Sequence, residues 1–263
     1  MDFFTKADWF DRPGPYAFRI EHILFIVFSV LIGVGLSLIL KKREKKTIKI
    51  VLITLWAFAL AVLTFYYGFI FYRCISDPVN HPFNLEGDLP LHSCTFFFYI
   101  FPFAMFSKNK YIKTAAFSFM VGISMTMGLV TMFVGCPASL FSFSGLCSLL
   151  YHAVIFIIPL IMVVTNFYDL QKDDLRYGLM LFGLLALTMW TFDALTGCDY
   201  FYIYDGHTFG ILYVISENVP HIIWTMITVT CYVLTAVIIH YSIYGIKTLI
   251  KNRKAQKPQP ENE

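Results

Sequence analysis

Seven long stretches with at most one charged residue each dominate this sequence and constrain its fold more than any other feature. A helix that crosses a bilayer needs about 20 consecutive, mostly apolar residues. These stretches have about this length and predict seven spans: Ile20 to Leu40, Ile50 to Tyr72, Leu89 to Phe106, Thr114 to Val134, Leu149 to Phe167, Gly178 to Thr196, and Asn218 to Tyr244. The sequence therefore predicts an all-α membrane protein. The fourth and fifth spans are divided only by Gly135 to Gly145, whose Gly, Pro and Ser content is typical of a turn.

The composition agrees with this assignment and excludes other classes of protein. Only 14% of the 263 residues are charged, against about 25% in an ordinary soluble domain, and 58% are hydrophobic. These values exclude a disordered chain, a nucleic-acid-binding arm and a water-soluble enzyme of normal composition. Seven spans with short connections leave no room for a separate soluble domain. We expect an extracytoplasmic segment over 1–19, a seven-helix domain over 20–246 and a cytoplasmic tail over 247–263.

The lysines and arginines predict the orientation, because cytoplasmic loops of membrane proteins hold an excess of them. Six fall in the first connection, three in the third, two in the fifth and five near the C-terminus, whereas the opposite side receives only Lys6, Arg12, Arg19 and Arg73. The N-terminus is therefore expected outside and the C-terminus in the cytoplasm. We interpret the run Lys41 to Lys46 (KKREKK) as an orientation signal in preference to a lipid-specific basic patch. Because Met1 to Arg19 lacks a basic start followed by a short apolar run, we expect no cleavable signal peptide.

Ionisable residues of several spans fall at one depth. Counting about 1.5 Å per residue from the cytoplasmic charges places five side chains in the outer third of the membrane: His22, His92, Cys94, His152 and Asp193. Glu217 and His221 flank the same level. One interpretation is structural, with interfacial His and Asp reaching water and each Cys acting as a small hydrophobe. The other is a polar, aromatic-lined cavity open toward the outer leaflet, because ionisable groups within spans are costly and need a common reason.

The most specific local pattern within this layer is GDLPLHSC, Gly87 to Cys94. Pro90 suits the first turn of a helix and Asp88 suits its cap, so Cys94 is expected about one turn into that helix, near its positive end. His92 is about 200° away around an ideal helix, so a base for Cys94 must come from another helix. His152 is the best candidate, and Asp193 is a candidate to orient it.

At these residues the chain resembles a known family. LPLHSC at Leu89 to Cys94, His22 within FRIEHI, and YHAVIFIIP at Tyr151 to Pro159 resemble the YwaF-like family of bacterial integral membrane proteins. Members of that family are similar to a vertebrate acyltransferase that transfers polyunsaturated chains onto ether phospholipids through a cysteine and a histidine. More distantly, they are similar to androgen-induced hydrolases of fatty-acid esters. The chain departs from the family pattern at CDYFYI, Cys198 to Ile203.

The resemblance implies a function and a location. It implies a lipid acyltransferase or acyl-ester hydrolase in a bacterial cell membrane, with Cys94 as nucleophile and His152 as base. The expected partners are membrane lipids: a phospholipid or lysophospholipid and a fatty acyl chain. His22, His92, Glu217 and His221 are then candidates to bind the lipid. No cofactor or metal is expected, and the sequence does not fix the oligomeric state.

Two other classes of function remain open at this point. A transporter or lipid-binding protein would use the same cavity without chemistry, although no inverted repeat supports transport. A membrane zinc hydrolase would draw ligands from the same layer, but the chain has no HxxxH or HExxH spacing. Four cysteines at or near the outer face would permit a disulfide: Cys74, Cys136, Cys147 and Cys198.

Overall fold

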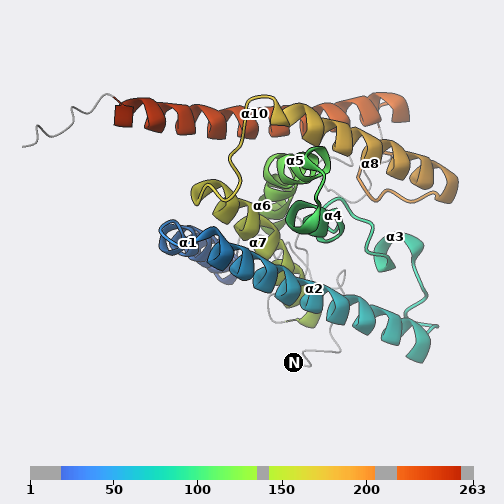
Figure 1. The fold of residues 1–263 in the computed structure, drawn as a ribbon. Coiled ribbons are helices and arrows are strands. Elements are labelled where there is room, and N and C mark those ends of the chain that lie inside the picture. The colour runs from blue at the N-terminus through green and yellow to red at the C-terminus, as the bar shows by residue number, and fades with distance from the viewer. Residues whose placement is uncertain (1–18, 135–141, 205–217, 256–263) are drawn as a thin grey trace, which may run out of the picture.

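The structure, a computed structural model, describes residues 19–134, 142–204 and 218–255. These residues form a bundle of helices (Figure 1). Its elements are α1 (Ile20–Leu40), α2 (Lys45–Ser76), α3 (Leu85–Asp88), α4 (Phe96–Phe106), α5 (Lys110–Phe119), η1 (Met120–Ser124), α6 (Met125–Val134), α7 (Phe143–Val164), α8 (Asp174–Thr196) and α10 (His221–Ala255). No strand occurs among these residues, and six of the helical rods are long and apolar enough to cross a membrane. The predicted all-helical membrane architecture is therefore confirmed.

The third expected span differs from its prediction. Its helix, α4, begins at Phe96 instead of Leu89 and has 11 residues, too few to span a bilayer alone. Leu89 is extended, as residues that precede proline generally are, and the chain then turns before the helix starts. The Thr95 hydroxyl closes these turns by donating to the carbonyl groups of Pro90 and His92, both at 2.8 Å. Cys94 consequently lies just before the helix and not one turn inside it.

The fourth span is one rod made of three elements. α5, η1 and α6 follow one another without a break, and η1 is a five-residue π-helix in the middle of the rod. A π turn inserts an extra residue and changes which side chains face the neighbouring helices. The rod begins at Lys110, four residues before the predicted start, and α7 likewise begins at Phe143 instead of Leu149. α7 continues as a helix through Pro159.

α7 forms the centre of the bundle and is packed by small residues of its neighbours. Along α1, the buried residues Ser29, Gly33 and Ser37 recur at intervals of four, and a Cβ placed at Gly33 would lie 3.1 Å from the Ile157 side chain. On α6, a Cβ at Gly128 would lie only 2.9 Å from the carbonyl oxygen of His152. Small residues at this spacing let membrane helices approach closely, which is how most of their association is stabilised.

A hydrogen bond from α2 satisfies a carbonyl group of α4 that has no partner within its own helix. Pro102 lacks an N–H group, so the carbonyl group of Phe98, one turn earlier, has no partner within the helix. The indole N–H of Trp56 donates to this carbonyl at 3.3 Å, and the Trp56 ring stacks on Phe101 with 5.3 Å between centroids. This pairing fixes α4 against the middle of α2.

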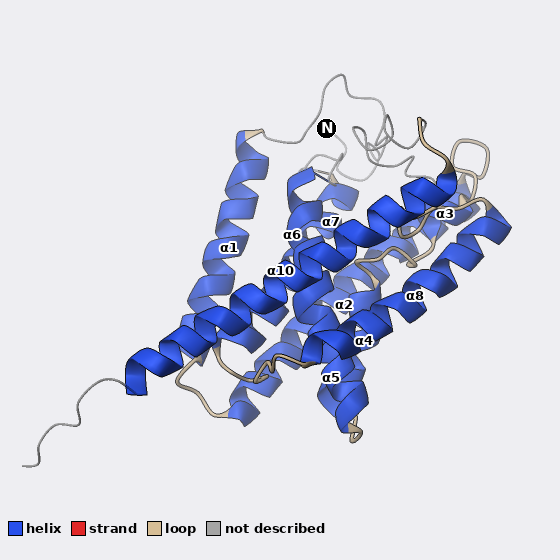
Figure 2. Cartoon of the chain, turned by 90° about the horizontal axis from the view of Figure 1, so that it is seen from above, coloured by secondary structure: helices blue, strands red, loops and turns tan. Residues whose placement is uncertain are grey.

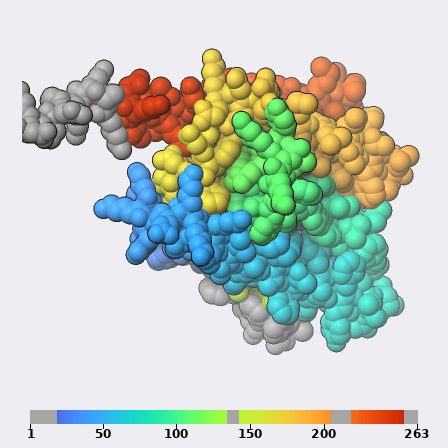
Figure 3. Space-filling model, in the orientation of Figure 1, coloured from blue at the N-terminus to red at the C-terminus, as the bar shows by residue number. Residues whose placement is uncertain are grey.

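Three chain segments far apart in the sequence meet at one end of the bundle. Figure 3 shows the surfaces of the α1–α2 connection (blue), the start of α5 (green) and the α7–α8 connection (yellow) adjoining one another. In Figure 2, α10 runs diagonally across the other helices, and its early residues lie at the opposite end, near the end of α8. The bundle therefore has a lysine-rich end and an end that holds α3 and the residues preceding α4.

Candidate functional site

Cys94 lies in the segment that joins α3 to α4 and is surrounded by tyrosines. Its side chain is only 8% exposed. Four tyrosines, one each from α2, α7, the 197–204 segment and α10, lie close enough to interact electrostatically with the thiol: Tyr67, Tyr151, Tyr202 and Tyr232. The thiol therefore occupies a point where four separate parts of the chain converge.

His152 lies on α7 with its ring held in one orientation. The Nδ1 atom lies 2.8 Å from the carbonyl oxygen of Ser148, one turn earlier on the helix, and 3.4 Å from the Ser148 hydroxyl. Because a carbonyl oxygen only accepts hydrogen bonds, the proton of a neutral ring sits on Nδ1. The Nε2 atom is buried without a hydrogen-bond partner. His152 thus presents an unprotonated nitrogen to the interior of the bundle.

His92 connects the Cys94 segment to His152 and to the residues after α8. The ring of His92 lies 5.1 Å from that of Tyr200 and stacks on that of Tyr202 at 5.9 Å. His92 also interacts electrostatically with His152, and the Tyr151 ring lies 4.2 Å from that of His152. Among the described residues no side-chain hydrogen bond joins Cys94 directly to His152. Cys94 belongs to the same buried cluster as Tyr151, whose ring lies beside that of His152.

Asp193 does not orient His152 in this structure. It lies fully buried in the last turn of α8, where its Oδ2 accepts a hydrogen bond from the backbone N–H of Tyr200 at 3.2 Å. Its other oxygen, Oδ1, is buried without a partner. The carboxyl group therefore holds the chain that follows α8, while the Ser148 carbonyl takes the orienting role that was expected of Asp193.

The remaining predicted site residues lie apart from Cys94. His22 is fully buried, and its Nε2 lies 2.6 Å from the carbonyl oxygen of Met132, so it joins α1 to the end of α6. His221 is exposed at the start of α10, with Nδ1 3.1 Å from the carbonyl oxygen of Tyr204. Glu217 lies outside the described residues. His22 and His221 thus each bond to a carbonyl group, of Met132 and of Tyr204 respectively.

The sequence analysis missed the inward course of residues 198–204. Tyr200 and Phe201 are fully buried, and the Tyr200 hydroxyl donates to the carbonyl group of Leu85, the first residue of α3. Tyr202 has a φ of 56°, in the left-handed region. Tyr232 of α10 fastens this segment, because its hydroxyl lies 3.2 Å from that of Ser93 and 3.3 Å from the Phe201 carbonyl oxygen. Gly197, with a φ of 75°, ends α8, but no local pattern indicated that the aromatic residues after it turn inward.

The described cysteines and ionisable groups form neither a disulfide bond nor a metal site. Cys74, Cys147 and Cys198 are free thiols, and Cys136 lies outside the described residues. Within the part of the chain that the structure describes, no group of three His, Cys, Asp or Glu side chains is arranged to hold a metal ion. A buried thiol and a buried imidazole with a free nitrogen are instead the components of covalent acyl transfer.

Comparison with known proteins identifies the family but no characterised relative. The family model of the TMEM164 family, a family of membrane proteins, matches residues 17–246. No curated protein and no solved structure matches the chain. The comparisons give no support to the expected YwaF-like membership. Because the match covers nearly all of the helical bundle, this multi-pass membrane protein belongs to the TMEM164 family.

Proposed function

We propose that this protein is a membrane-embedded acyltransferase that moves a fatty acyl chain between lipids through a thioester on Cys94. The observation that carries the proposal is the state of His152. Its Nδ1 bonds to the Ser148 carbonyl, and its buried Nε2 has no partner. A neutral imidazole held in this tautomer is a ready proton acceptor, which a buried thiol needs in order to act as a nucleophile.

The reaction proceeds in two balanced steps. The Cys94 sulfur attacks the carbonyl carbon of a lipid ester, forming a C–S bond, and His152 Nε2 accepts the thiol proton. As the C–O bond of the ester breaks, His152 returns this proton to the departing alcohol. The hydroxyl of an acceptor lipid then gives its proton to His152 and attacks the thioester, so that a new C–O bond forms, the C–S bond breaks and Cys94 regains a proton.

The geometry favours transfer to a lipid over hydrolysis. Cys94 is 8% exposed and His152 only 3%, with tyrosine and phenylalanine side chains around them. A site that excludes bulk water protects a thioester from hydrolysis until an acceptor is bound. Acid–base contacts often tighten only in the substrate complex, so a bound ester between the thiol and Nε2 would complete the contact that they lack here.

His92 is the best placed residue to bind a lipid in this proposal. Its Nδ1 is buried without a partner, and its ring lies beside Tyr200 and Tyr202, close to His152. Because the ring donates its proton to the Tyr200 backbone through its other nitrogen, Nδ1 would accept a hydrogen bond from a hydroxyl of the bound lipid. His22, His221 and Glu217 are not assigned a role, because the first two are engaged elsewhere and the third is not described.

We also propose seven crossings, with the N-terminus outside. α2 and α5 both begin beside one cavity at the lysine-rich end, which Lys45 and Lys110 both line. Since α2 runs away from that end, the chain over 77–109 must return to it before α5 starts. The residues before α4 and α4 together would make this crossing. The excess of Lys and Arg supports a cytoplasmic location for the lysine-rich end. With that orientation, Cys94 would lie toward the outer leaflet.

An adduct experiment tests the proposed chemistry. The purified full-length protein is incubated with a phospholipid carrying a labelled acyl chain, and intact-protein mass spectrometry follows the adduct. We expect one acyl group that hydroxylamine releases, absent in Cys94→Ala and retained in the control Cys231→Ala, whose thiol is exposed on α10. An adduct of unchanged yield in Cys94→Ala would overturn the proposal.

The same preparation separates catalysis from binding without chemistry. With a lysophospholipid present, transfer predicts a labelled diacyl product, whereas a hydrolase would release free fatty acid. A protein that only binds or transports lipid would retain the labelled lipid in both the wild type and Cys94→Ala and form neither product.

A further inference from the structure

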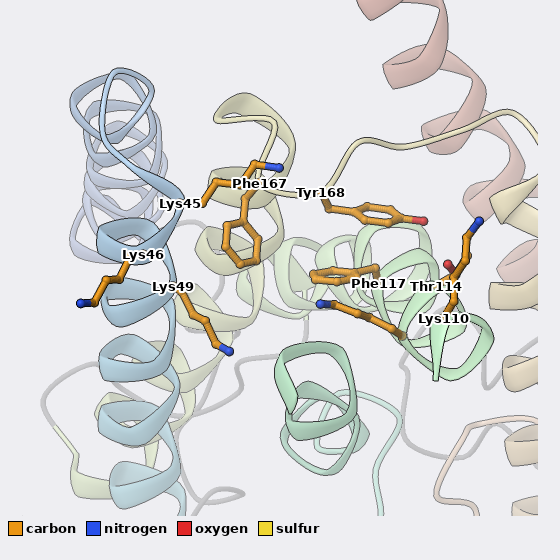
Figure 4. A pocket seen from close by; sticks show the side chains of 9 residues that line it. Lys45, Lys46, Lys49, Lys110, Thr114, Phe117, Phe167 and Tyr168 are labelled. Atoms are coloured by element: carbon orange, nitrogen blue, oxygen red, sulfur yellow. The ribbon is translucent and has the colours of Figure 1, made fainter. Parts of the chain in front are cut away.

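A cavity lies at the lysine-rich end of the bundle, away from Cys94. It has a volume of about 470 Å³ and lies between the start of α2, the start of α5 and the α7–α8 connection. Its lining residues are Lys45, Lys46, Lys49, Lys110, Lys113, Thr114, Phe117, Phe167 and Tyr168 (Figure 4). Five of these nine side chains are lysines and none is acidic. α4 separates this cavity from the candidate active site by its whole length, roughly 16 Å at 1.5 Å per residue.

The backbone adds to the positive potential of this cavity. α2 begins at Lys45 and α5 at Lys110, so two helix N-termini lie at its wall, and neither helix has an acidic residue in its first turn. Helix N-termini carry partial positive charge and normally attract acidic side chains. The Asn109 side chain caps α5 by accepting from the N–H groups of Tyr111 and Ile112, whereas α2, which follows Glu44, has no side-chain cap. An anion at this position would meet ammonium groups and the positive end of α2 together.

The aromatic side chains form the neutral part of the wall. Phe117 and Tyr168 stack with their centroids 4.4 Å apart, and the Lys113 ammonium lies 6.0 Å from the Phe117 ring. Burial and a hydrogen bond to Asp174 raise the pKa of the Tyr168 phenol above its ordinary value, so it adds no negative charge. The Asp174 carboxylate also accepts a hydrogen bond from the backbone N–H of Gln171 at 2.8 Å. Both of these bonds join it to the α7–α8 connection.

Some of the lysines face the gap and others point away from it. In Figure 4, Lys45 and Lys49 extend toward the gap bordered by Phe117 and Phe167, whereas Lys46 extends to the other side of α2 and Lys110 extends away from the gap. Lys49 also donates to the Met105 carbonyl at 3.1 Å, at the last turn of α4. Orientation in the membrane requires only that lysines lie on one side. Their convergence from two separate connections on one cavity requires a different explanation.

We propose that this cavity binds the phosphate-bearing headgroup of an anionic membrane phospholipid. Basic pockets between membrane helices at such a surface bind anionic headgroups, and a volume of about 470 Å³ has the size of a small-molecule site. A lipid is favoured over soluble phosphate because apolar side chains stand beside the lysines: Ile50 is 56% exposed and Phe106 is 58% exposed. These side chains suit the acyl region of a lipid whose phosphate lies among the ammonium groups.

Native mass spectrometry of the purified full-length protein tests this site. The protein is titrated with phosphatidylglycerol, with phosphatidylcholine and with inorganic phosphate. We expect preferential retention of phosphatidylglycerol, reduced at least tenfold in the triple variant Lys45→Gln, Lys49→Gln, Lys113→Gln, because each lysine contributes roughly fivefold to the affinity for an anionic surface. The matched control Lys172→Gln, Lys251→Gln, Arg253→Gln loses the same charge from exposed positions outside the cavity and should retain binding.

The other outcomes each contradict the proposal. An equal loss in both triple variants would show that general surface charge attracts the lipid. Retention of both phospholipids to the same extent, or binding of inorganic phosphate without preference for phosphatidylglycerol, would exclude an anionic lipid site. The circular dichroism spectrum of each variant reports whether its helices remain. Labelling of Cys94 by an acyl donor is measured in parallel, since failure of one site leaves the other unaffected.

Discussion

At the scale of single residues, the most informative feature is a histidine whose two nitrogens have different surroundings. His152 Nδ1 is 2.8 Å from the Ser148 carbonyl oxygen, and Nε2 is buried without a partner. A buried polar atom without a hydrogen bond costs about 1–3 kcal/mol, so a fold that retains one forgoes stability at that position. Asp193 Oδ1 and His92 Nδ1 are buried in the same condition. The Ser118, Ser124 and Thr228 hydroxyls share this condition, so it does not by itself mark a ligand site.

Substitutions at His152 and Ser148 distinguish the role of the imidazole as a base from the role of the hydrogen bond that orients it. His152→Asn keeps a donor near the position of Nδ1 but removes the basic Nε2, so we expect acyl transfer to fall by about 10²–10⁴. Ser148→Ala leaves the carbonyl that holds the ring and removes a hydroxyl that lies 3.4 Å from Nδ1 and also bonds to Tyr151, so its activity should fall far less than that of His152→Asn. Rates of lipid product formation by both variants measure this. Equal loss in the two variants would contradict the assigned tautomer.

The sequence singled out Cys94 and His152, and both side chains are buried in the structure. Their roles as nucleophile and base stay predictions. The tyrosines around Cys94 were not predicted, because aromatic residues are expected throughout a membrane protein and carry little positional information. The pairing of His152 with its own helix was missed for another reason. A backbone carbonyl is available at every residue, so the sequence cannot indicate which one a side chain will choose.

At the scale of elements, the helices approach one another most closely at glycine residues. A Cβ at Gly128 of α6 would lie 2.9 Å from the His152 carbonyl oxygen and 3.0 Å from the Phe156 backbone nitrogen. At Gly178 of α8, it would lie 2.5 Å from the Ser118 hydroxyl. The first contact involves backbone atoms, which cannot rotate away. The distance between α6 and α7 is therefore set by the absence of a side chain at Gly128.

An alanine at Gly128 should separate α6 from α7. Gly128→Ala is expected to destabilise the protein by about 1–3 kcal/mol, as overpacking of a tight contact does, and to reduce activity because His152 lies at the contact. Gly183→Ala is the matched control, since a Cβ there meets nothing within 4 Å. The unfolding temperature of each variant in detergent measures the effect. A midpoint for Gly128→Ala equal to that of the wild type would show that α6 and α7 are not fixed at this distance.

Prediction at this scale succeeded for long helices and failed for the short one. α1 matches its predicted span from Ile20 to Leu40, because nothing within that stretch interrupts a helix. α4 was predicted to begin at Leu89, but Pro90 and the hydroxyl of Thr95 hold residues 89–95 in turns. Pro90 suits a helix start as well as a turn, so the local sequence did not distinguish the two.

At the scale of the whole molecule, the bundle has two chemically different ends. The lysines of the α1–α2 and α4–α5 connections surround a cavity at one end. Cys94, His92 and Tyr200 are packed between helices toward the other, beside α3. α4 runs between these two regions and is fixed to α2 through Trp56. A lipid at the lysine-rich end and a lipid at the candidate active site would therefore occupy separate positions on one bundle.

Labelling with a membrane-impermeant maleimide tests the proposed crossings. Single cysteines are introduced at Lys42, Val79 and Lys108 after the six native cysteines have been replaced. Val79 is 88% exposed between α2 and α3 and should label in intact cells. The cysteines at positions 42 and 108 should label only after permeabilisation, because both precede helices that start beside the lysine-lined cavity. Labelling of positions 79 and 108 from the same side would exclude a crossing by α4.

The sequence by itself determined that this chain is a helical membrane protein and where most of its helices lie. Charge is costly inside a bilayer at every position. A membrane span can therefore be predicted from a lack of charged residues without knowledge of the rest of the fold. The tertiary structure decided which side chains meet. Residues 198–204 pack inward against His92, the Ser148 carbonyl holds His152, and lysines of two connections converge on one cavity. Such contacts depend on the rotation and separation of neighbouring helices, which small residues such as Gly128 and the π turn of η1 set.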